Sequence, residues 1–154
     1  MKTIRNILAV LGIGLLLSGC ATSQSSSSAF FPDWQPNIDQ PIRQLEETLS
    51  KLDQQQPMNF TISNVAFLYD TKLYILFNDF IGQLPKSQRA SELEEQRKWL
   101  NQRKKLIAAG YAEYEGGTLA AYNAGHISID ASKKRIAEIE KKMKGLPAMP
   151  STVP

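Results

Sequence analysis

The glycine pair Gly116-Gly117 constrains this chain most, because it separates two long stretches that both have helical periodicity. Such periodicity places apolar side chains on one face of a helix. Before the pair the apolar residues recur at spacings of seven, seven and four, and after it at seven, three and four: Leu93, Leu100, Ile107 and Tyr111, then Ile129, Ile136, Ile139 and Met143. Glycine adopts either sign of φ without strain. We therefore predict a helix, a glycine turn with a short connecting segment, and a second helix folded back on the first.

We expect the helix before the turn to span about residues 87–114 and the helix after it about residues 128–144, with Thr118 or Ser128 as its cap. Opposite charges four residues apart, such as Glu94 with Lys98, mark the solvent faces and contribute ~0.2–0.5 kcal/mol per pair.

Residues 61–84 are the richest in large apolar side chains and predict a central helix, with Ser63 or Asn64 as its cap. The β-branched residues between Phe60 and Leu68 also fit a short strand. Charged and polar residues interrupt the run, which argues against a membrane span.

An apolar stripe at Ile42, Leu45, Leu49 and Leu52 predicts a further helix from a cap at Asn37 or Asp39 to about residue 55. Core packing is favoured over a partner-binding coiled coil, because two heptads are short for the latter. The expected fold is an all-α bundle of about four helices over residues 37–145, followed by a proline-rich tail over residues 146–154.

The first 19 residues have the layout of a signal peptide, with Lys2 and Arg5 ahead of an apolar run that is too short for an ordinary span of about 20 residues. The run ends in Leu17-Ser18-Gly19-Cys20, which resembles the lipobox of bacterial lipoproteins. An ordinary secretory signal with a chance cysteine is the alternative. We favour acylation of Cys20, the only cysteine, which would anchor the chain in a lipid bilayer. Ala21 after the cysteine suggests, by resemblance to Gram-negative lipoproteins, a periplasm-facing place on the outer membrane.

Residues 20–36 form a Ser-rich tether that ends in an aromatic cluster, Phe30, Phe31 and Trp34. This cluster is either a membrane-interface or docking patch or, as we favour, a strap packed over the domain. Cleavage before Cys20 removes two of the 18 basic residues, which leaves 16 against 15 acidic residues. A net charge of +1 indicates no nucleic-acid partner.

The ordered set Gln96-x-x-Trp99-x-x-x-Arg103, Gly116-Gly117-Thr118 and Ser132-x-x-Arg135 resembles the LprI-type lysozyme-inhibitor domain of bacterial envelope proteins. The resemblance covers about residues 73–143. It implies a domain that binds a lysozyme-type muramidase and blocks its cleft, with these eight residues as the family motif.

Two cysteines of the family pattern are absent, and their positions fall at Ile107 and about Ile127. We expect an apolar contact between the two helices to replace the disulfide, since one buried isoleucine contributes roughly 1.5–3 kcal/mol and a disulfide ~2–4 kcal/mol.

Few residues point to catalysis. The single histidine, His126, is more typical of a surface or capping position, and no set of His, Cys and carboxylate residues predicts a metal site or another cofactor. We expect Trp99 and Arg103 to stack, and Arg135 to donate to backbone carbonyls near the glycine turn, so that the motif is structural. Besides the muramidase-binding hypothesis, a structural or adaptor lipoprotein that docks an envelope protein complex or peptidoglycan stays open. An enzyme such as a peptidoglycan hydrolase is the least favoured alternative.

Overall fold

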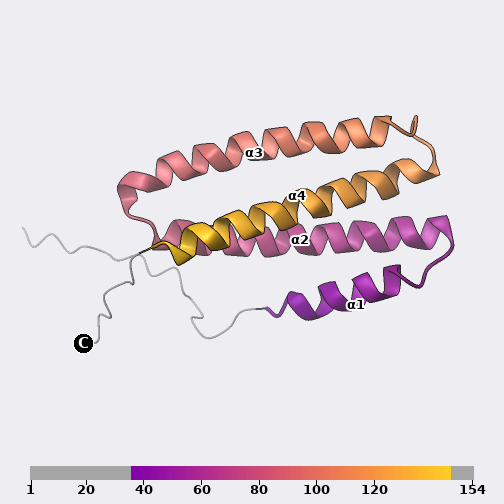
Figure 1. Ribbon diagram of the computed structural model, residues 1–154, viewed down its shortest axis with the longest axis horizontal. Helices are drawn as coiled ribbons and strands as arrows, with labels where there is room; N and C mark the ends of the chain where they lie inside the picture. Colours follow the sequence, from indigo (N-terminus) through magenta and orange to yellow (C-terminus); the bar gives the residue numbers. More distant parts are fainter. Residues whose placement is uncertain (1–35, 147–154) are drawn as a thin grey trace, which may run out of the picture. The chain divides into compact units, whose positions relative to one another are not determined.

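The computed structural model describes residues 36–146, which form four helices: α1 (Asp39–Leu49), α2 (Gln55–Gln83), α3 (Lys86–Ala112) and α4 (Thr118–Lys144). The predicted all-α bundle is confirmed (Figure 1). The predictions for the signal peptide, Cys20, the aromatic cluster and the end of the tail lie outside the described residues.

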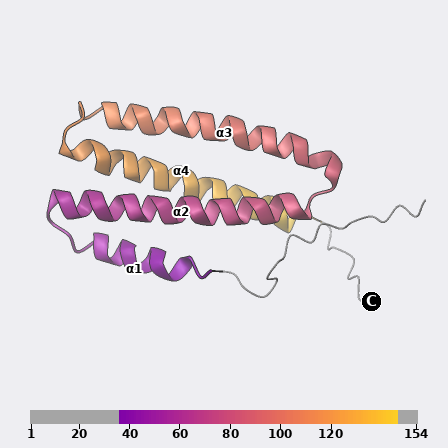
Figure 2. The ribbon, with the colours of Figure 1, turned by 180° about the vertical axis from the view of Figure 1, so that it is seen from behind.

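Helix α4 lies between α2 and α3 and packs along both, whereas α1 lies on the other side of α2 (Figures 1 and 2). The main core is where α1, α2 and α4 meet. Its fully buried side chains include Ile62 and Val65 of α2 and Ile139 of α4. Because α2 and α3 contact each other little, the side between them is left open.

Glycine lets α2 and α4 approach closely at one point. A Cβ added to Gly125 would lie 2.7 Å from Cγ1 of Ile62, whose side chain is completely buried. Gly110 of α3 similarly makes room for Ile127 of α4, since an added Cβ would lie 2.0 Å from its Cδ1. Both glycines are inside helices, where an alanine would otherwise be favoured by about 1 kcal/mol.

The predicted reversal between α3 and α4 is confirmed at Glu115 and Gly116, which have φ values of 50° and 74°. Gly117 is extended (φ −63°, ψ 176°) and is the residue before α4. The cap prediction was wrong, because Thr118 is already the first helical residue and no side chain caps α4.

Several predicted boundaries were also wrong. Helix α4 starts ten residues before Ser128, and α2 starts at Gln55, with Pro57 in the first turn, where a proline is tolerated. Neither Ser63 nor Asn64 is therefore a cap, and the alternative strand near Phe60 is absent because this segment is helical. Helix α1 ends at Leu49 rather than near residue 55, and its N-cap is Ile38 rather than the predicted Asn37 or Asp39. Asn37, one residue before the cap, still accepts from Gln40 N with its Oδ1 at 3.2 Å.

Candidate functional site

Asp70 of α2 connects the three long helices through its carboxylate. It accepts an ion-paired hydrogen bond from the guanidinium of Arg103 on α3 and one of 3.1 Å from Ser132 Oγ on α4. The Arg103 guanidinium also donates to Ser128 Oγ at 2.6 Å. One charged side chain on α3, which is 12% exposed, is thus held by both neighbouring helices.

Arg135 of α4 is nearly completely buried, with 4% of its surface exposed, and forms a second polar connection to α3. Its Nε donates to the buried Gln96 Oε1 at 2.9 Å, and its Nη1 donates to Glu95 and Glu138, each at 3.0 Å. The predicted partners, backbone carbonyls near the glycine turn, were wrong. Gln96 and Glu95 of α3 and Glu138 of α4 accept from Nε and Nη1 instead, and the buried Nη2 has no partner among the described residues.

Trp99 lies beside both guanidinium groups. The Cζ atoms of Arg103 and Arg135 are 5.6 Å and 5.8 Å from its ring centroid, a distance at which a cation is attracted to an aromatic face. The predicted Trp99–Arg103 contact is therefore confirmed, and Arg135 is an additional neighbour.

The structure brings five of the eight motif residues together between α3 and α4, namely Gln96, Trp99, Arg103, Ser132 and Arg135. The other three, Gly116, Gly117 and Thr118, lie at the turn between these helices, where the backbone carbonyl of Thr118 accepts from Asn59 Nδ2 at 2.8 Å. Ile127 packs over Gly110, one turn from Ile107; the replacement of a disulfide by an Ile107–Ile127 contact stays a prediction.

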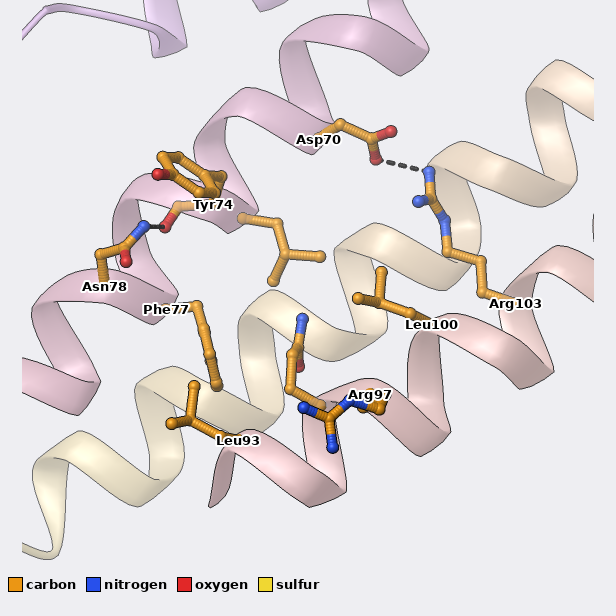
Figure 3. A pocket seen from close by; sticks show the side chains of 10 residues that line it. Asp70, Tyr74, Phe77, Asn78, Leu93, Arg97, Leu100 and Arg103 are labelled. Atoms are coloured by element: carbon orange, nitrogen blue, oxygen red, sulfur yellow. Dashed lines mark hydrogen bonds and ion pairs between the residues drawn. The ribbon is translucent and has the colours of Figure 1, made fainter. Parts of the chain in front are cut away.

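A groove of about 570 Å³ lies between α2 and α3 (Figure 3). Its apolar lining includes Tyr74 and Phe77 of α2 and Leu93 and Leu100 of α3, and the Asp70–Arg103 pair lies at one end. Arg97 extends from α3 at the groove and pairs with Glu94 on its own helix. The groove is thus mainly apolar, with Asn78 and Arg97 as polar residues along it and the Asp70–Arg103 pair at one end.

Three large aromatic side chains on α2, spaced seven residues apart, are about 70% exposed: Phe60 (72%), Phe67 (69%) and Tyr74 (70%). Residues seven apart lie on nearly the same helix face, so this row continues along α2 from Tyr74, which lines the groove, past the Asp70–Arg103 end to Phe67 and Phe60. On α3, Leu93 and Leu100 have the same spacing and are 47% and 46% exposed. Contiguous exposed apolar side chains of this kind mark interaction surfaces.

Charged contacts between α3 and α4 are concentrated at Glu95 and Lys142, which are 2.9 Å apart. The hydrogen bond from Lys142, then that from Arg135, lowers the pKa of the Glu95 carboxyl. Burial lowers the pKa of the Lys142 ammonium, but its bonds to Glu92 and Glu95 outweigh burial, so the net pKa is raised. Both groups are therefore charged over the whole neutral range, as expected for ion pairs that hold helices together.

Catalytic geometry is sparse in the part of the chain that the structure describes. His126 is exposed, with its ring edge-on to Tyr122 at 4.5 Å. Within residues 36–146 no group of three or more His, Cys, Asp or Glu side chains is placed to hold a metal ion. None of the four described helices is long and apolar enough to cross a membrane.

The fold and the groove define residues 36–146 as an all-α bundle with one side left open between two helices. No family model, no curated protein and no solved structure matches this chain. The resemblance to the LprI-type domain therefore stays a prediction carried by the motif residues alone.

Reasoning from the sequence missed the groove and its exposed aromatic row. The signal was present, because Phe60, Phe67 and Tyr74 repeat at seven residues within a helix that is apolar around much of its circumference. Only the placement of α4 reveals which of these apolar faces is covered. Asp70 is one of the charged residues that interrupt the apolar run of residues 61–84, and no sequence pattern indicates that it pairs with Arg103.

Proposed function

We propose that this chain is a lipid-anchored, non-catalytic binding module of the bacterial cell envelope, which holds a partner protein in the α2–α3 groove. The observation that carries this proposal is the row Phe60, Phe67 and Tyr74, whose side chains remain about 70% exposed and of which Tyr74 lines the groove. Burying such side chains fully contributes roughly 1.5–3 kcal/mol each. A partner that covers them gains the apolar area typical of the energetic centre of an interface.

The first candidate partner is a lysozyme-type muramidase, as the resemblance to the LprI-type domain implies. In this function the acylated Cys20 holds the module on the periplasmic side of the outer membrane, where it protects peptidoglycan without any chemistry of its own. The chain anchored in lipid vesicles should then slow the clearing of a peptidoglycan suspension by a muramidase.

A matched pair of variants tests whether the groove is responsible. Phe67→Glu places a charge in the aromatic row that continues the Tyr74 edge of the groove, whereas Leu106→Glu changes an exposed side chain (57%) on α3 that belongs neither to this row nor to the groove lining. Inhibition should be lost in Phe67→Glu and retained in Leu106→Glu. Equal inhibition by both variants, or none by the unaltered chain, would exclude muramidase binding in the groove.

The charge of α3 favours a second candidate function, an adaptor for an envelope protein complex. From Arg97 to Ala112 this helix has five basic residues and no acidic ones. Animal lysozymes are basic, and like charges across an interface oppose association. An adaptor that binds an acidic partner should retain that partner from envelope extract in mild detergent, and the Phe67→Glu variant should lose it while Leu106→Glu keeps it.

A further inference from the structure

The groove between α2 and α3 resembles the space that one further helix would fill in a helical bundle. Helices α2 and α3 run antiparallel, and the Asp70–Arg103 pair fixes their register. Counting in opposite directions from this pair places Tyr74 level with about Leu100 and Phe67 level with about Ile107. Tyr74 and Leu100 therefore face each other across the groove, and the two seven-residue rows continue to Phe67 and Ile107 beyond its Asp70–Arg103 end. A repeat of seven matches the period of a packed α-helix and does not match the two-residue period of a strand.

The length of the aromatic row sets the size of the missing element. Phe60 and Tyr74 are 14 residues apart, which corresponds to about 21 Å along a helix at 1.5 Å per residue. A partner helix of about 14–20 residues covers this row, and its diameter of about 10 Å matches the spacing of packed helices.

The two edges of the groove differ in charge. On α3, Arg97 lines the groove, and Lys104 follows seven residues later on the same face. On α2, the corresponding outer positions near Tyr74 are the uncharged Thr71 and Asn78. Arg97 is engaged only by Glu94 of its own helix in an exposed pair, and such pairs contribute little. Apart from the Asp70–Arg103 pair, the α3 edge thus has basic residues and the α2 edge is uncharged.

Resting on the proposed binding function, we infer that the groove takes one amphipathic α-helix of a partner protein, with acidic residues seven apart on the flank that faces Arg97 and Lys104. A second copy of this chain is a poorer occupant, because the one acidic side chain that lines its groove, Asp70, is already paired with Arg103. Charge complementarity at this edge sets the orientation of the partner helix, since only one of its flanks then faces α3.

Two synthetic peptides of 21 residues test this inference. Both have leucine at the a and d positions of three heptads, and they differ only in one flank, which is glutamate in one peptide and lysine in the other. Binding to the full chain in nanodiscs of zwitterionic lipid is measured by fluorescence anisotropy. The glutamate peptide should bind about tenfold more tightly than the lysine peptide, as expected for two exposed ion pairs gained in one case and two repulsions in the other.

The variant Arg97→Glu/Lys104→Glu should reverse this preference. The matched control is Lys134→Glu/Lys141→Glu, which changes two exposed lysines, also seven apart, on α4 and away from the groove. The control should retain the preference for the glutamate peptide, and circular dichroism should show the same helix content for both variants.

Equal affinity for the two peptides, or a preference that Arg97→Glu/Lys104→Glu leaves unchanged, would overturn the inference. It is also overturned if ultracentrifugation shows dimers that Phe67→Glu dissociates, or if a peptide of residues 29–36 binds more tightly than the glutamate peptide. If neither peptide binds while Phe67→Glu still abolishes retention of the natural partner, the occupant is not a helix of this kind and the proposed function stands.

Discussion

Replacing Arg135 by alanine tests whether the buried motif network holds α3 on α4. The largest loss is at Gln96, since it leaves a buried carbonyl without its 2.9 Å donor, which costs about 1–3 kcal/mol. Removal of the guanidinium from beside Trp99 adds ~0.5–1 kcal/mol. Glu95 and Glu138 have side chains 49% and 56% exposed, so water replaces the lost bonds there at little cost. We expect the free energy of unfolding to fall by about 2–4 kcal/mol.

Urea unfolding followed by circular dichroism at the helix band measures this loss. Glu138→Ala is the matched control, because it removes one exposed partner of the same guanidinium and should change the free energy of unfolding by less than about 1 kcal/mol. A loss below about 1 kcal/mol for Arg135→Ala, or equal losses for the two variants, would refute the argument that the Gln96 bond and the Trp99 contact dominate.

Three further predictions concern glycine packing, the turn and pH. Gly125→Ala should destabilise the fold by ~1–2 kcal/mol, because the new Cβ meets Ile62. Gly82→Ala should stabilise the fold by up to ~1 kcal/mol, because its Cβ would have nothing within 4 Å. Thermal melts in which both variants shift the melting temperature in the same direction would contradict the close approach of α2 and α4. Gly116→Ala should cost ~1 kcal/mol, because φ there is +74°, and an unchanged melting temperature would show that the turn relaxes freely. Because the pKa of Glu95 is lowered in the folded state, its carboxylate stabilises the fold at pH values above its ordinary pKa of 4.5, and this stabilisation is lost as the pH falls through the lowered pKa. In an acid titration, Glu95→Gln should therefore lose less free energy of unfolding than the unaltered chain. Identical titrations would refute this.

The fold class was predictable because each long helix has an apolar stripe or a charged face that local sequence reveals. The start of α4 was less predictable, since Gly125, which precedes the expected start at Ser128, is more typical of a turn than of a helix. A glycine is needed at this helical position because Ile62, more than 60 residues earlier in the chain, occupies the space where a side chain would be. No local pattern contains this contact.

The candidate site was predicted in part for a similar reason. The Trp99–Arg103 contact follows from a spacing of four on one helix, and it was found. The partners of Arg135 and the role of Asp70 depend on how three helices pack, and neither follows from spacing. The groove exists because α2 and α3 contact each other little, and the periodicity of neither helix predicts how closely two helices approach.

Away from the tight turn where Arg89 donates to the carbonyls of Gly82 and Leu84, the only polar bond between α2 and α3 in the described chain is that of Asp70 with Arg103. On the open side, the separation of the two helices is therefore bridged by a single pair of side chains, while α4 holds both helices from the opposite side. A ligand wider than the gap has to displace this ion pair, and it leaves the packing of α4 against both helices in place.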